Sequence, residues 1–242
     1  MSQGRQFSIR TARYAILLFP LAIAALPHAS GDSQKSKSAP PGRKEAPLEP
    51  GEIDTDRSRV FIFVGKTGFG HEHAIEGHIK SGEVHLRGRN AGTIEFDLSS
   101  FVADTPAARS YLKLKGEIPD STRRKVTQNM QSAEVLDVQS FPTATFEIDS
   151  ARAVTAEGKK SGTMDFELQG NFTLHGETHK LTIRARPTPQ KDGTVRLTGQ
   201  FEILQTDFGI TPFTAGLGTI GVANRLTIYG DLYLAAEGNA AR

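Results

Sequence analysis

The sequence predicts an antiparallel all-β protein, and the residues on either side of a His-Gly-Glu turn at 175–177 show this most clearly. Apolar and polar residues alternate both before and after that turn, over residues 163–185. Successive side chains of a strand point to opposite faces, so this alternation gives one face that can be buried and one that stays in water. The same period recurs through most of the chain. The number and spacing of the alternating segments suit a closed barrel or a sandwich.

The candidate strands follow one another with short gaps in all but one place. They are residues 59–66, 74–81, 83–88, 92–98, 143–153, 162–174, 178–186, 194–205 and 225–235. The first differs from the others, because the run from Val60 to Val64 is apolar on both faces. We therefore expect another part of the chain to cover its outer face.

The long gap, at residues 99–140, breaks the alternation. A Pro-Asp-Ser run at 119–121 offers a helix N-cap, and Val126 and Met130 are four residues apart, as on one face of a helix. We expect a short helix over residues 122–131. We interpret this helix as a lid over the outer face of the first strand.

The first thirty residues have the three-part order of a secretory signal peptide. Arg5, Arg10 and Arg13 precede an uncharged stretch at 14–26, and small residues follow up to Gly31. The uncharged stretch contains Pro20 and is shorter than the about 20 apolar residues of a spanning helix, so a membrane anchor is the weaker interpretation. We expect residues 1–30 to be a signal peptide, and the mature chain to be periplasmic or secreted without an integral membrane span.

The rest of the chain divides by composition. Residues 31–51 are rich in Ser, Lys and Pro with little to bury, so we expect a disordered linker. Residues 52–236 suit one barrel domain, and residues 237–242 form a short tail. The chain has no cysteine, which excludes disulfides, thiolate metal sites and a cysteine nucleophile.

The charge balance excludes one class of partner. Without the three arginines of the leader, the 29 Lys and Arg become 26 basic residues against 27 acidic ones. A protein that binds nucleic acid through its phosphates needs an excess of basic residues. We therefore expect no nucleic-acid partner.

Four stretches of the chain resemble the YceI-like polyisoprenoid-binding family. They read Gly-His-Glu-His-Ala-Ile-Glu-Gly at 70–77, Ser-Phe-Pro-Thr-Ala-Thr-Phe at 140–146, Gly-Asn-Phe-Thr-Leu-His-Gly at 170–176 and Thr-Asp-Phe-Gly-Ile at 206–210. The resemblance covers about residues 52–236. It implies a lipocalin-like, antiparallel up-and-down barrel of about eight strands, in exported proteins, whose apolar interior holds a long isoprenoid chain. The histidines of the first stretch and a long insert at 110–131 depart from the family pattern, which leaves the ligand open.

An eight-stranded barrel is just wide enough either to be filled by its own side chains or to hold one slender ligand. With the resemblance, we favour a carrier of a polyisoprenoid or other long-chain lipid over a filled core. Burial contributes about 0.8 kcal/mol per CH₂ unit, so such a ligand needs few specific contacts. The apolar residues that we expect to bind it are Phe96, Phe146, Phe166, Leu168, Phe172, Ile183, Phe201 and Leu232.

His71 and His73 complete the candidate ligand-binding residues. Two histidines two residues apart on a strand aim both imidazoles to one side. A tetrahedral metal site needs further ligands, and His85, His175 and His179 are scattered along the chain. The pair can serve a structural role, contact a polar head group or bind a metal, and the sequence leaves these alternatives open. We expect no metal and no other cofactor.

Catalytic motifs are missing from the sequence. It has no Gly-x-Ser-x-Gly elbow, and its acidic residues mostly fall on outward strand positions, where charges are solvated. The glycine-rich run at 208–221 lacks the lysine of a phosphate-binding loop, so we expect a loop at the barrel mouth. We therefore expect no enzyme and no catalytic residue. The alternatives are a metal-dependent envelope enzyme using His71 and His73, and a structural envelope module with a filled core.

Overall fold

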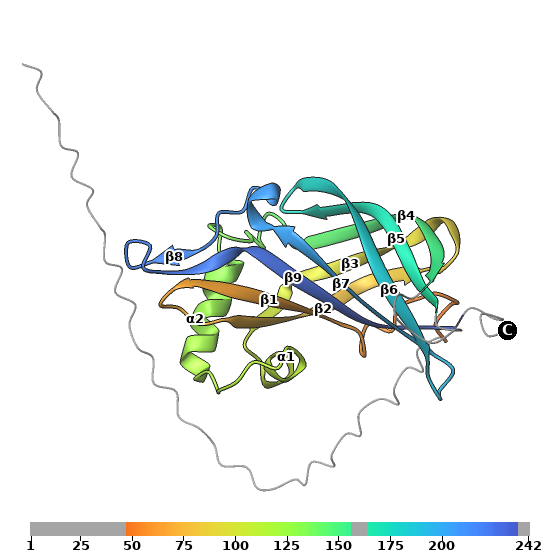
Figure 1. Cartoon of the computed structure of the whole chain (residues 1–242), viewed down its shortest axis with the longest axis horizontal. Helices are drawn as coiled ribbons and strands as arrows, with labels where there is room; N and C mark the ends of the chain where they lie inside the picture. The colour runs from red at the N-terminus through yellow and green to blue at the C-terminus, as the bar shows by residue number, and fades with distance from the viewer. Residues whose placement is uncertain (1–46, 156–163, 237–242) are drawn as a thin grey trace, which may run out of the picture. The chain divides into compact units, whose positions relative to one another are not determined.

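The computed structural model describes residues 47–155 and 164–236 of the chain. In this part of the chain, eight long strands form one antiparallel barrel (Figure 1). Each strand pairs with the next, and β9 pairs with β1 to close the sheet. This confirms the predicted up-and-down barrel of about eight strands. The strands are β1 Arg59–Gly68, β2 His73–Val84, β3 Gly88–Ala103, β4 Thr143–Thr155, β5 Met164–Leu174, β6 Glu177–Pro189, β7 Val195–Leu204 and β9 Ile220–Leu234.

Four short elements complete the described fold. They are α1 Pro106–Tyr111, α2 Asp120–Gln131, the 3-10 helix η1 Gln205–Phe208, and β8 Thr214–Ala215, which pairs with β9. The helix expected at 122–131 is α2, although its N-cap is Pro119 and no side chain caps it. Within the described ranges, no helix has the length and apolar character needed to cross a bilayer.

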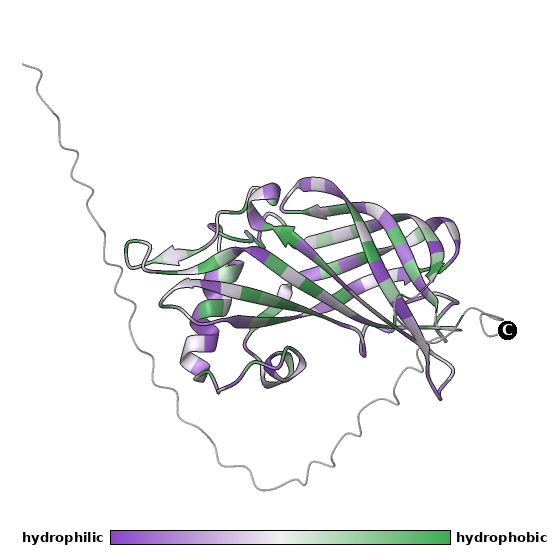
Figure 2. Cartoon of the chain, in the orientation of Figure 1, coloured by the Kyte–Doolittle hydropathy of each residue, from purple (hydrophilic) through white to green (hydrophobic). Residues whose placement is uncertain are grey.

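The alternation read from the sequence appears in the barrel as hydrophilic and hydrophobic bands along each strand (Figure 2). The inward residues form one core, in which aromatic rings meet edge to face. Phe172 is central to these contacts. Its ring centroid lies 6.2 Å from that of Phe96, 5.7 Å from that of Phe201 and 5.6 Å from that of Phe208.

The outer face of β1 is covered at Phe61, as its two apolar faces predicted, but not by the expected helix. Phe61 stacks on Tyr111 at the end of α1 with 4.0 Å between ring centroids, and Ala108 is buried in the same small cluster. Helix α2 instead packs against β3, and its Val126 and Met130 contact the barrel core. The lid interpretation of residues 122–131 was therefore wrong, because α1 was not foreseen.

Other expectations were wrong in detail. Residues 83–88 form no separate strand, since β2 runs to Val84 and the next strand begins at Gly88. At the start of β5, Met164 is exposed and Asp165 is buried, the reverse of the expected alternation, because Asp165 accepts two hydrogen bonds of 2.7 Å from Arg186. The predicted signal peptide (1–30), most of the predicted linker and the tail (237–242) lie outside the described residues.

Candidate functional site

An apolar cavity of about 270 Å³ lies inside the barrel, at the end where α2 and β8 are found (Figure 1). Residues of seven strands line it, and Val126 and Met130 of α2 close part of it. Among the described residues, four of its lining side chains are polar. They are His71, His73, Asn129 and Gln205.

The structure divides the predicted ligand-binding residues between two spaces. Phe96, Phe172, Phe201, His71 and His73 line the larger cavity. A second, nearly filled space of about 50 Å³ lies deeper in the barrel, and Phe96 and Phe201 border both spaces. The other predicted residues that line this second space are Phe146, Leu168, Ile183 and Leu232. Phe166 is buried in the core but lines neither space.

The larger cavity opens to solvent near the turn between β1 and β2. Three of its lining residues, His71, Phe213 and Ile220, are exposed. Ile210 and Gly221 also line it, so the predicted mouth loop at 208–221 contributes four lining residues. The interior is apolar, and its polar groups include the two histidines at this open end.

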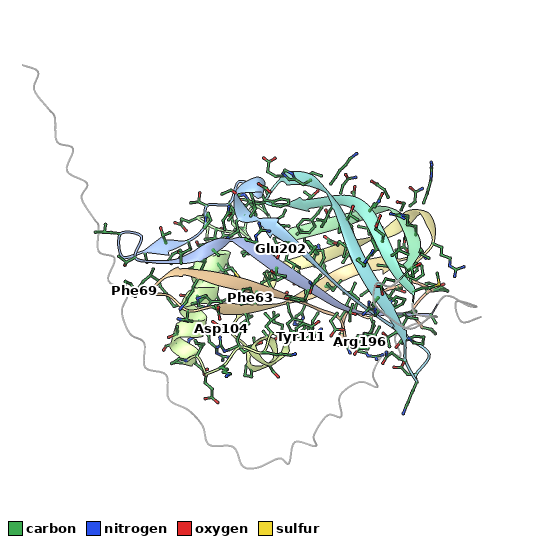
Figure 3. All side chains as sticks on the ribbon, viewed as in Figure 1. Phe63, Phe69, Asp104, Tyr111, Arg196 and Glu202 are labelled. Atoms are coloured by element: carbon green, nitrogen blue, oxygen red, sulfur yellow. The ribbon has the colours of Figure 1, made fainter. Side chains whose placement is uncertain are left out.

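His71 and His73 lie side by side at the start of β2, with 4.5 Å between ring centroids. The His73 Nδ1 is 2.6 Å from the Oδ2 of Asp104, whose side chain is fully buried. The Oδ1 of Asp104 accepts hydrogen bonds from the Ala74 N–H at 3.1 Å and from Arg109 at 2.9 Å. Asp104 lies between the end of β3 and the start of α1 (Figure 3).

Hydrogen bonds and burial shift the pKa of two of these side chains, Asp104 and His71. Burial alone would raise the pKa of Asp104, but hydrogen bonds from His73, Ala74 and Arg109 outweigh it and hold the pKa below its ordinary value. Asp104 is therefore ionised at neutral pH and accepts the Nδ1 proton of His73, which fixes the orientation of the His73 ring. Burial and the neighbouring His73 lower the pKa of His71, so His71 is neutral at pH 7.

The same residues are the described group best placed to hold a metal. One ligand atom each of His71, His73 and Asp104 lies within 4.8 Å of the others. However, three donors already engage the Asp104 carboxylate, and a metal on it would have to displace the His73 hydrogen bond and lie beside the Arg109 charge. Asp104 is better suited to orient His73 than to act as a third ligand.

We therefore expect no stoichiometric metal in the protein. Two imidazoles without a free third ligand make an incomplete tetrahedral site. Elemental analysis after purification without chelators checks this. One zinc, copper or iron per chain, lost when His71 and His73 are both replaced by alanine, would show that the expectation is wrong.

Sequence reasoning missed Asp104, Arg109, Asn129 and Gln205. The Asp-Thr-Pro run at 104–106 is a helix-start signal, since Thr105 caps α1 and proline occupies its first turn. That signal could have placed Asp104 at the junction of a strand and a helix. It could not have placed Asp104 against His73, which lies 31 residues earlier in the chain.

Comparison with known proteins agrees with this architecture. The YceI-like domain family matches residues 52–233. A UPF0312 protein of Azotobacter vinelandii is 35% identical over 94 residues, which are 38% of this chain and 45% of that protein. One of Shewanella baltica is 30% identical over 119 residues, which are 47% of this chain and 59% of that protein. The chain thus spans about half the length of these curated relatives.

A solved structure gives the same fold at low identity. It is a polyisoprenoid binding domain from Saccharophagus degradans, described as implicated in plant cell wall breakdown. It is 12% identical, with a TM-score of 0.51, and the match covers 77% of this chain and 98% of that one. At this identity the likeness establishes the barrel and its topology.

Proposed function

Because the chain belongs to the YceI-like domain family, we propose that it carries one long apolar lipid, an isoprenoid or a similar chain, in its barrel. The observation that carries this proposal is the apolar cavity of about 270 Å³, with one open end. A filled core would leave no such space. The Saccharophagus domain of the same fold, described as polyisoprenoid binding, supports the choice of ligand class by analogy.

The size of the cavity favours a slender ligand. It lies just below the range of about 300–1,000 Å³ for small-molecule pockets. Phe96 and Phe201 separate it from the second space of about 50 Å³, so we propose that these rings limit how far a chain can enter. A longer chain would require the two rings to turn aside. Binding would come mainly from apolar burial, at about 0.8 kcal/mol per CH₂ unit.

The polar groups suggest an orientation for the ligand. We propose that the head group lies at the open end, near His71 and His73, and that the tail runs inward toward Phe172. Asp104 holds the His73 ring in place through Nδ1, so Nε2 is the ring nitrogen that a head group can contact. With no nucleophile assigned in the cavity, we propose binding rather than catalysis.

The proposal is tested by titration with a fluorescent polyene lipid of isoprenoid type. We expect saturable binding of one molecule per chain, and competition by unlabelled polyprenol. Glucose, as a polar control, should not compete. Absence of saturable binding at micromolar protein would count against a carrier.

We also propose that the protein is exported, from the leader pattern of its first thirty residues. The chain isolated from an envelope fraction should then begin near Ser30. N-terminal sequencing measures this directly. Recovery of a membrane-embedded form that retains Met1 would contradict it.

A further inference from the structure

Large apolar side chains are exposed around the cavity mouth. Seven large apolar side chains are exposed among the described residues, and four of them lie in the β1–β2 turn or around β8. We refer to these four, Phe69, Phe213, Leu217 and Ile220, as the apolar rim. Phe69 is 91% exposed and lies at the tip of the barrel end (Figure 3). Clustered exposed apolar side chains mark interaction sites, whereas scattered ones need no explanation.

The fold holds the parts of the apolar rim together. The Phe69 N–H donates to the Thr219 carbonyl at 3.1 Å, and Gly68 pairs with Ile220 across β1 and β9. Phe213 and Ile220 also line the cavity. Apolar surface therefore runs from the cavity, through these two side chains, to Phe69 and Leu217 outside.

Leu217 contributes no burial to the fold, and its backbone is unfavourable. It has a φ of 57°, between Gly216 at 58° and Gly218 at 84°, so it occupies the left-handed region that suits glycine. Its side chain is fully exposed. Replacing Leu217 by glycine would cost the isolated chain no stability. The leucine side chain, however, can contact an external apolar surface.

The charges around the apolar rim indicate the kind of surface that it fits. Residues 208–221 contain no charged side chain. In the β1–β2 region, Lys66 and Glu72 provide one charge of each sign. These two segments are thus apolar and without net charge, which matches the boundary between the head groups and acyl chains of a bilayer.

We propose that the apolar rim inserts into the surface of a lipid bilayer and sets the cavity mouth against it. A lipid could then pass between bilayer and cavity without exposing its chain to water. This purpose rests on the proposed carrier function, but the docking itself rests on the exposed side chains. A second copy of the chain is the other surface that could cover the rim, and the experiment distinguishes the two.

Single tryptophans test the insertion, because the protein has no tryptophan of its own. Leu217→Trp reports on the rim, and Met164→Trp, at an exposed position at the opposite end of the barrel, is the matched control. On addition of phosphatidylcholine vesicles, we expect a blue shift of emission for the rim tryptophan and none for the control. Equal spectra for both variants, with and without vesicles, would overturn the proposal.

Further variants measure how strongly the apolar rim partitions to the vesicles. Removing both outer side chains, with Phe69→Ser and Leu217→Gly, should weaken partitioning to the vesicles at least a hundredfold, about tenfold for each. Met164→Ser should leave it unchanged, and 0.5 M salt should have little effect. The thermal midpoint of Leu217→Gly alone should not fall. Partitioning that persists in the double variant would overturn the proposal.

Two further measurements, of oligomeric state and of lipid content, distinguish membrane docking from dimerisation and from the carrier function. Light scattering without vesicles should show a monomer. If the wild type is instead a dimer and the double variant is a monomer, the apolar rim contacts a second copy of the chain, and membrane docking is overturned. The lipid content of the double variant should equal that of the wild type. If neither holds lipid while the vesicle shift remains, the carrier function fails and the docking stands.

Discussion

Arg109→Met is expected to lower the free energy of unfolding by about 3–5 kcal/mol, because it leaves the buried carboxylate of Asp104 without its arginine partner. The Arg109 side chain is 10% exposed and pairs with Asp104 at 2.9 Å. It also donates to the carbonyls of Lys115 and Gly116, which tie the loop after α1 to the barrel. Urea denaturation at pH 7 measures the change.

Arg152→Met is the matched control for this variant. Arg152 pairs with Glu167 on the barrel surface, and its side chain is 62% exposed. Exposed ion pairs contribute about 0–1 kcal/mol, so this substitution should cost far less. Equal destabilisation by the two substitutions would show that the Asp104 pair is not special.

The cost of Arg109→Met should also depend on pH. In the folded protein the pKa of Asp104 is held below its unfolded value of about 3.9. Ionised Asp104 therefore stabilises the fold above that pH, and this contribution is lost as the pH falls through the lower folded pKa. Without Arg109 the carboxyl can protonate at higher pH, which removes the unpaired charge. The difference between variant and wild type should thus be largest near neutral pH and shrink below pH 4.

Ala144→Phe is expected to reduce lipid affinity more than tenfold with a modest change in stability. Ala144 is buried on β4, opposite Phe96, and lines the larger cavity. A ring at this position would occupy space that the ligand needs. The lipid titration and thermal melts of wild type and variant are the measurements.

Leu168→Phe is the control for the cavity variant. Leu168 is 2% exposed and borders the space of about 50 Å³, where an added ring has little room. Overfilling there should cost about 1–3 kcal/mol while leaving lipid affinity less affected. If Ala144→Phe is destabilised as strongly as Leu168→Phe and binding does not change, the larger cavity is not the binding site.

The strands could be predicted from sequence because their signal is local. Alternation at 163–185 fixes which side chains share a face, and the apolar run at 60–64 predicted that both faces of β1 would be covered. The alternation failed at Asp165, because Arg186, 21 residues later in the chain, makes burial of this carboxylate favourable. Helix α1 escaped notice since six residues are too few to show a helical period.

The candidate site could be predicted only in part. The His-x-His spacing placed His71 and His73 together, but their partner Asp104 depends on the pairing of β2 with β3. That pairing has two register irregularities, at residues 76–78 and 79–81. Counting residues from the β2–β3 turn therefore does not identify the residue that lies beside His73. Whether the barrel is hollow depends on how its rings pack, which the period of the strands does not determine.

The lipid content of the purified protein tests the central claim most directly. The measurement is mass spectrometry of an organic extract from protein purified without detergent or denaturant, beside an equal amount of Ala144→Phe. We predict a long-chain isoprenoid or similar lipid near one molecule per chain in the wild type, and much less in the variant. A wild-type extract free of any long-chain lipid, from a protein that also fails to bind added polyprenol, would contradict the carrier account.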